Sequence, residues 1–321
     1  MQDEIRVTVT AARRQGAAKL SRVAGVTSAD TIYGVDRISE RVVLAWLEKH
    51  WPRAWALEVV MEGIADGEVV TFPHGTSVAQ TQWKLILDPI DGTRGLMYDK
   101  RSAWSLAALA PQRGARNTLA DIQVAAMTEL PTSKLGVVDQ LSAVRGVGVK
   151  ATRLVLHSSR RQALRLAPST AKDVTHGFAS FAKFLPEGKA WLAEREEGLW
   201  QKLGWSGAKG GQPIFDDQYI STGGQLYELL MGHDRFVADL RPFAYAQLGL
   251  GESTPLACHP YDICTALIAQ EAGCVVVGAD GKPLRAPLDT TTSVAWVGYA
   301  NKALARKIGP ALREVLELDS C

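Results

Sequence analysis

Two carboxylates three residues apart, Asp88 and Asp91, close an apolar run that begins at Trp83. A run of this kind is typical of a buried strand, so both acids would lie at a strand end, followed at once by Gly92 and Thr93. Carboxylate oxygens are hard ligands that suit Mg²⁺. Unpaired N–H groups at a turn or helix start suit phosphate. The segment therefore predicts chemistry on a phosphate.

Each of these residues also has an ordinary structural alternative. Asp-Gly is a common turn pair, and Thr is a common helix cap, so Asp91, Gly92 and Thr93 taken singly carry little weight. The whole string over residues 88–93, Asp-Pro-Ile-Asp-Gly-Thr, favours the metal interpretation. Its proline removes a backbone donor and helps to turn the carbonyl of Ile90 away from a strand ladder.

Three more acidic residues stand where a metal site would need them. Glu62 closes the apolar run 57–61, an expected strand, and open α/β folds place sites at strand ends. Asp36 and Asp262 each open an expected helix, so capping is the alternative interpretation for both. In the functional interpretation Asp262 is a further metal ligand, and Asp36 orients the hydroxyl of Thr93. A two-metal phosphatase needs several carboxylates of this kind.

The elements expected around these residues alternate between strands and helices. Hydrophobic spacing predicts helices over residues 36–50, 226–231 and 261–272, and a helix capped by Ser159 that contains Arg160 and Arg161. Gly232 and Gly273 are placed to end two of the helices. Expected strands, beside the run that ends at Asp88, cover residues 57–61, 105–110, 122–127 and 275–277. The sequence does not assign strands or helices within residues 173–217, which are rich in Phe, Trp and Gly. The pattern favours a layered α/β fold.

Composition limits the protein class. With 321 residues we expect two subdomains, an α+β metal-binding unit over 1–152 and an α/β unit over 153–321 that completes the site. The net charge of +2 argues against a nucleic-acid polymer as partner. No apolar run reaches the ~20 residues of a membrane helix, and no signal peptide is visible. The four cysteines, at 258, 264, 274 and 321, lack zinc or disulfide spacing, so we expect a cytoplasmic protein.

Residues 88–93 resemble the metal motif of the inositol monophosphatase family. Residues 261–273 are similar to that family's Trp-Asp helix, which ends in Glu-Ala-Gly-Gly. Glu62 stands where the family has a Gly-Glu-Glu segment, and Asp36 where it has an aspartate that opens the second helix. Because these matches run from Asp36 to Gly273, the resemblance covers most of the chain.

The resemblance implies a metal site with two to three Mg²⁺ ions. Glu62, Asp88 and the carbonyl of Ile90 would hold one ion. Asp88, Asp91 and Asp262 would hold the second, and a third ion would lie loosely near Glu62. The implied fold is an αβαβα sandwich of the sugar-phosphatase type. The resemblance also implies a homodimer and inhibition of the enzyme by lithium.

The resemblance also implies how a substrate is attacked. Glu62 and Thr93 would position a nucleophilic water, with Asp36 behind Thr93, while the N–H groups of Gly92 and Thr93 bind the phosphate. The predicted enzyme is a metal-dependent phosphomonoesterase that hydrolyses a small phosphorylated metabolite, similar to inositol monophosphate, by direct attack of a metal-activated water. A fructose-1,6-bisphosphatase or a 3′(2′),5′-bisphosphate nucleotidase remains an alternative.

The chain departs from the family pattern at several positions. Gly63 replaces the second of the paired glutamates, and Arg94 follows Thr93 in place of a polar residue. Tyr261 replaces the Trp before the aspartate, and Cys274 replaces the second Gly of the helix stop. The Gly63 change affects the expected third metal site, and the Arg94 change affects which substrate the pocket would accept.

Two other functions compete with this one. Residues 91–93 echo the Asp-x-Asp-Gly-Thr motif of haloacid-dehalogenase-type phosphatases, but Pro89 stands where their nucleophilic aspartate would be. Gly63 keeps open a relative without catalytic activity that binds a phosphometabolite.

Overall fold

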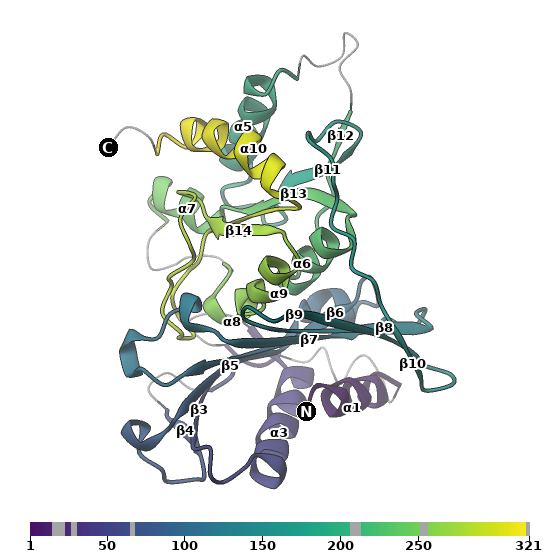
Figure 1. The fold of residues 1–321 in the computed structure, drawn as a ribbon, viewed down its shortest axis with the longest axis vertical. Coiled ribbons are helices and arrows are strands. Elements are labelled where there is room, and N and C mark those ends of the chain that lie inside the picture. Colours follow the sequence, from purple (N-terminus) through teal and green to yellow (C-terminus); the bar gives the residue numbers. More distant parts are fainter. Residues whose placement is uncertain (15–22, 27–30, 65–67, 206–212, 251–255, 319–321) are drawn as a thin grey trace.

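The structure is a computed structural model that describes residues 1–14, 23–26, 31–64, 68–205, 213–250 and 256–318. Its layers alternate between helices and sheets (Figure 1). Helices α1 (Gln2–Arg14) and α3 (Gly34–His50) cover the outer face of the first sheet. The middle helices α6 (Thr222–Met231), α8 (Pro260–Ile263) and α9 (Ala266–Glu271) lie between this sheet and the second. The far side of the second sheet carries α5 (Lys189–Lys202) and α10 (Lys302–Val315). The fold is the predicted layered αβαβα sandwich.

The first sheet has eight strands in the order β10-β9-β8-β7-β6-β5-β3-β4. Its neighbours pair antiparallel, except for the parallel pair of β3 and β5. The strands are β3 (Leu57–Met61), β4 (Val70–Phe72), β5 (Trp83–Asp91), β6 (Ala103–Pro111), β7 (Val124–Leu130), β8 (Val137–Val144), β9 (Gly148–Val155) and β10 (Arg160–Ala163). A short pair, β1 (Val23–Val26) and β2 (Thr31–Tyr33), forms a separate hairpin before α3.

Alternation along the strands sends apolar side chains to both faces of this sheet. Leu57, Val59 and Met61 pack toward α1 and α3, together with Leu85 and Leu87 of β5. The opposite face belongs to the larger core beneath the middle helices, where Ile86, Trp104 and Leu106 are buried. Both faces are therefore covered, which explains why β5 reads as a continuous apolar run rather than an alternating one.

The second sheet has five strands in the order β12-β11-β13-β15-β14. The strands are β11 (Gly177–Phe181), β12 (Ile214–Phe215), β13 (Asp234–Asp239), β14 (Val275–Gly278) and β15 (Trp296–Tyr299). Two further helices are α4 (Thr93–Met97) and α7 (Arg241–Gln247). Helices α6 and α9 contact both sheets, so they join the two halves of the chain.

Several predicted elements are confirmed and others are wrong. The strand at 57–61 and the glycine stops at Gly232 and Gly273, both with positive φ, are present. The helix predicted at 261–272 is divided into α8 and α9. The helix predicted after Ser159 is wrong, because that residue lies in a turn and Arg160–Ala163 pairs with β9 as a strand. Strand pairing has overridden the capping signal there.

The first sheet continues as far as β10, and the second begins with β11. The proposed division at 152/153 stays a prediction. Cys258, Cys264 and Cys274 are free and buried, while Cys321 lies outside the described residues, as do residues 206–212. No helix in the described part of the chain is long and apolar enough to cross a membrane.

Candidate metal centre

A β-bulge in β5 places Asp88 and Asp91 on one face of the first sheet. Asp88 pairs with Leu106 and Asp91 with Trp104, so three steps along β5 match two steps along β6. Without the extra residue, side chains three apart would point to opposite faces. The proline within the bulge has no N–H to lose from the ladder. The bulge thus turns a sequence spacing of three into a pair of neighbouring carboxylates.

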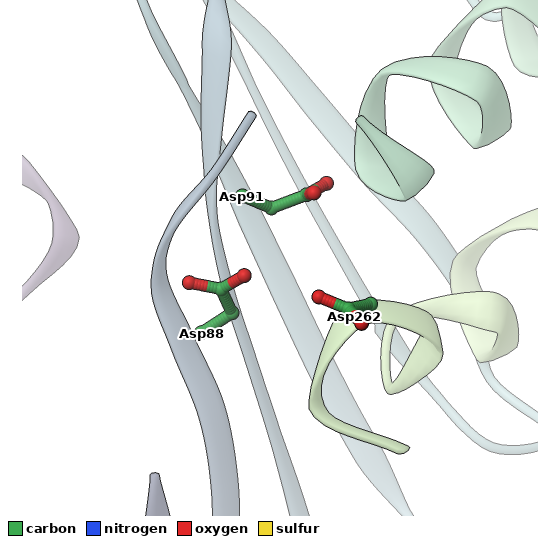
Figure 2. A group of neighbouring side chains, drawn as sticks. All are labelled: Asp88, Asp91 and Asp262. Carbon is green, nitrogen blue, oxygen red and sulfur yellow. The ribbon is translucent and has the colours of Figure 1, made fainter. Parts of the chain in front are cut away.

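Asp262 faces this pair from the start of α8 (Figure 2). One carboxylate oxygen from each of Asp88, Asp91 and Asp262 lies within 4.8 Å of the other two. Asp262 also caps its own helix, because its Oδ2 accepts the backbone N–H of His259 at 2.6 Å. Asp262 therefore caps the start of α8 and also belongs to the acidic cluster, while its role as a metal ligand stays a prediction.

Burial and the charges of neighbouring acids raise the pKa values of Asp88 and Asp91. Burial, followed by the charges of Glu62, Asp91 and Asp262, raises the pKa of Asp88 well above its ordinary value, although the N–H of Ile90 at 2.8 Å opposes the shift. Burial, followed by the charge of Asp262, raises the pKa of Asp91 to about 7. A divalent cation would remove this repulsion. The donor set of carboxylate oxygens fits Mg²⁺.

Thr93 and Asp36 meet as the sequence predicted. Thr93 Oγ1 lies 3.0 Å from Asp36 Oδ1 and 2.8 Å from the carbonyl oxygen of Ile90. A hydroxyl has one proton and donates to one of these acceptors at a time. The other carboxylate oxygen of Asp36 accepts the N–H of Tyr33 at 2.7 Å, which caps α3. Asp36, like Asp262, combines a cap with a contact in the site.

All of the predicted site residues line one pocket. They are Asp36, Glu62, Asp88, Ile90, Asp91, Gly92, Thr93 and Asp262. Gly92 precedes α4 with a φ of 92° and is followed by the first amides of that helix, which have no carbonyl partner within it. The pocket therefore joins an acidic wall to a backbone edge that can donate hydrogen bonds.

The sequence did not reveal that the start of α6 holds Asp91. Oδ2 of Asp91 accepts the hydroxyl of Ser221 at 2.8 Å and the N–H of Gly223 at 2.6 Å. Oδ1 accepts the N–H of Thr222 at 3.3 Å. The positive end of the helix dipole also favours a carboxylate at this position. Asp91 is thus fixed from the second half of the chain.

Two glycines allow this close approach. A Cβ on Gly223 would lie 2.6 Å from Leu106 Cδ2, and a Cβ on Gly92 would lie 2.9 Å from the Cβ of Ser221. The signal available in the sequence was the string Ser-Thr-Gly-Gly at residues 221–224, a capping serine followed by glycines unsuited to a helix interior. Our predicted helix began only at Leu226, so this signal was missed.

Comparison with known proteins gives structural matches alone: no family model and no curated protein matches the chain. A crystal structure of fructose-1,6-bisphosphatase from Leishmania major matches with a TM-score of 0.69 at 15% identity, over 98% of this chain and 92% of that one. The extragenic suppressor protein suhB from Bartonella henselae matches with a TM-score of 0.62 at 16% identity, over 97% and 95%. The chain has the inositol monophosphatase fold.

A third match agrees with this fold. It is a gene product described as inositol monophosphatase-fructose 1,6 bisphosphatase, with a TM-score of 0.62 at 15% identity, over 96% of this chain and 98% of that one. The resemblance stated from residues 88–93 and 261–273 is therefore confirmed at the level of the fold.

Two arginines and the aromatic residues Phe184 and Tyr33 also line the pocket. Arg241 is buried, binds Asp239 through two nitrogens at 2.8 and 2.5 Å, and lies 4.3 Å from the centre of the Phe184 ring. Arg94 lies 5.4 Å from the centre of the Tyr33 ring. All of these except Asp239 line the pocket, so a bound molecule would meet guanidinium groups and an aromatic ring.

Proposed function

We propose that this protein is a Mg²⁺-dependent phosphomonoesterase that hydrolyses a small phosphorylated metabolite similar to inositol monophosphate. The observation that carries the proposal is the convergence of Asp88, Asp91 and Asp262 within 4.8 Å, from segments far apart in sequence. The Thr93–Asp36 contact lies in the same pocket. The acids alone would fit many cation sites, but acids beside a positioned hydroxyl and the first amides of a helix fit phosphate hydrolysis.

The residues divide into three roles. Glu62, Asp88, the carbonyl of Ile90, Asp91 and Asp262 would hold two to three Mg²⁺ ions. When bound, such ions neutralise phosphate oxygens and lower the pKa of a water ligand. The N–H groups of Gly92 and Thr93 bind the phosphate oxygens.

Thr93 acts on the attacking water. When its hydroxyl donates to Asp36, a lone pair is left to accept a hydrogen bond from that water. Glu62, which lines the same pocket, would also hold this water and take up its proton. The water attacks phosphorus directly, the bond to the leaving-group oxygen breaks, and that oxygen takes a proton from solvent, so no phosphoenzyme forms.

The decisive experiment is a phosphate-release screen of the purified protein. Inositol monophosphates, sugar bisphosphates and 3′-phosphonucleotides are supplied with Mg²⁺, with EDTA, and with Mg²⁺ plus lithium. We expect release that requires Mg²⁺ and that lithium reduces. Tight binding of a phosphometabolite without any release at saturating Mg²⁺ would instead identify the non-catalytic relative. A trapped phosphoaspartate would contradict direct attack by water.

Arg94 favours the alternative substrates that carry a second anionic group, a sugar bisphosphate or a nucleotide bisphosphate. It follows Thr93 directly and lines the pocket, so a cation stands beside the expected phosphate site. Hydrogen bonds to charged groups contribute about 1.5–3 kcal/mol. Arg94→Ala should therefore raise KM about tenfold or more for a bisphosphate and change KM little for a monophosphate. A homodimer and a cytoplasmic location are proposed from the resemblance and composition alone.

A further inference from the structure

The side chain of Glu40 occupies the space that a side chain at residue 63 would need. An ideal Cβ on Gly63 would lie 2.0 Å from Glu40 Oε1 and 2.5 Å from the carboxyl carbon. Gly63 also has a φ of 89°, in the region that favours glycine. Residue 63 therefore cannot carry a side chain while Glu40 keeps its place.

Glu40 belongs to the same helix face as Asp36. The two are four residues apart on α3, so they are neighbours one turn apart, and both are buried. Asp36 contacts Thr93, and Glu40 contacts the residue that follows Glu62. One face of α3 thus reaches both segments that we expect to position the attacking water.

The burial of this carboxylate calls for an explanation, because burying a charge costs free energy unless it is paired. Its ion pair in the described part of the chain is with Arg37 at 3.2 Å, and the side chain of Arg37 is 47% exposed. Such partly exposed pairs contribute at most about 1 kcal/mol. Burial accordingly raises the pKa of Glu40. The ion pair alone does not account for an acid at this position.

We propose that Glu40 is a positioning residue of the metal centre, which fixes the turn after β3 so that Glu62 faces Asp88. The turn is closed by the N–H of Ile64, which donates to the carbonyl of Met61 at 3.2 Å, and Glu40 packs against its middle. The family resemblance places a second glutamate at position 63. Here a carboxylate from α3 takes that space. This inference rests on the proposed function, because it concerns the affinity of the pocket for Mg²⁺.

The first test measures Mg²⁺ binding by calorimetry on the purified, EDTA-treated protein. Glu40→Ala should weaken Mg²⁺ binding by about 10–100-fold, the range for residues that orient metal ligands. Glu40→Gln keeps the shape and should retain most of the affinity. Glu48→Ala is the matched control, since Glu48 lies on the same helix with a side chain 53% exposed. Circular dichroism establishes that each variant is folded.

The second test uses the clash itself. Gly63→Ala should weaken Mg²⁺ binding strongly in the native background and much less in the Glu40→Ala background, because the shortened side chain leaves room for the new methyl group. Additive effects of the two changes, or a Glu40→Ala variant that binds Mg²⁺ like the native protein, would overturn the inference. A native protein that binds no Mg²⁺ would overturn the proposed function as well, so the two failures are distinguishable.

Discussion

The two halves of the candidate site are built by different means. The first half presents Glu62, Asp88 and Asp91 at the ends of neighbouring strands, and a bulge aligns the last two. The second half contributes the starts of helices: Ser221 to Gly223 before and within α6, and Asp262 in α8. Strand ends supply charges that repel one another. The start of α6 supplies donors that hold one of those charges, whereas the start of α8 adds the charge of Asp262 to the cluster.

The carboxylates at the strand ends repel one another, and the hydrogen bonds from the start of α6 offset this repulsion only in part. Asp91 receives three hydrogen bonds from the start of α6, yet burial and Asp262 still raise its pKa to about 7. Helix starts alone therefore do not neutralise the pair. A bound cation would complete the neutralisation, as proposed above. Four substitutions or conditions separate the two contributions.

Asp88→Asn should have the largest effect. The amide oxygen keeps the contact with the N–H of Ile90, but the charge that would hold Mg²⁺ is lost. We expect the rate of Mg²⁺-dependent phosphate release to fall by more than about 100-fold. Residues that only orient a metal ligand typically change activity by about 10–100-fold. The metal-free variant should melt at or above the temperature of the native protein, because repulsion within the cluster decreases. Asp280→Asn, at an exposed turn, is the control, and undiminished turnover in Asp88→Asn would refute the proposed function.

Thr93→Val comes next, because it removes the hydroxyl that contacts Asp36 and Ile90 and keeps the side-chain shape. If that hydroxyl positions the attacking water, kcat should fall by about 10²–10⁴, the range for a positioned proton-transfer group. Thr93→Ser should retain most of the activity. Equal rates for Val and Ser at this position would show that Thr93 serves only as a structural residue.

Ser221→Ala tests the helix-borne half. It removes a hydrogen bond to Asp91 and the cap of α6, in which Ser221 Oγ accepts the N–H of Gly224 at 2.9 Å. Loss of the cap should cost about 1 kcal/mol of stability. Loss of the contact with Asp91 should weaken Mg²⁺ binding by about tenfold. Asn301→Ala removes the cap of α10 and two hydrogen bonds to the carbonyls of Ser169 and Ala171, so it should cost at least as much stability without changing Mg²⁺ binding. Equal binding defects in both variants would assign Ser221 to stability alone.

The smallest expected effect is a dependence of stability on pH in EDTA. Raised pKa values of Asp88 and Asp91 mean that the folded state binds more protons than the unfolded chain above about pH 4. Their contribution is therefore complete below that pH and is lost as the pH rises through about 7. The melting temperature should fall over this interval, by roughly 2–4 °C for each kcal/mol lost. Saturating Mg²⁺ should remove the slope, and a flat profile in EDTA would argue against a crowded acidic cluster.

The strands near the site could be predicted because their patterns are local. The run that became β3 is short and apolar, and its predicted bounds match the structure. Residues 173–217 could not be ordered, because their aromatic side chains suit a buried strand as well as a buried helix. They contribute β11 and α5, and Phe181 and Trp200 from these elements pack around Phe236.

The predicted site residues lie in one pocket, but their roles stay predictions. Asp36 and Asp262 were identified as both possible caps and possible site residues, and each is a cap as well as a neighbour of the site. The contact of Ser221 with Asp91 was missed, because a capping serine bonds to its own helix and this local bond does not reveal a distant partner. A local pattern cannot show which distant side chain a helix start will meet.

The sequence by itself determined which groups could bind a metal and where they stand along the chain, namely carboxylates at strand ends and helix starts. It also determined the glycines, which stand where no side chain fits. Only the tertiary structure decided which of them meet. The bulge in β5 aligns Asp88 with Asp91, the packing of α8 on the first sheet brings Asp262 to both, and α3 sets Glu40 against Gly63. Apart from the Asp88–Asp91 pair, these contacts join residues from tens to more than a hundred positions apart. All of them depend on how sheets and helices pack rather than on any local preference.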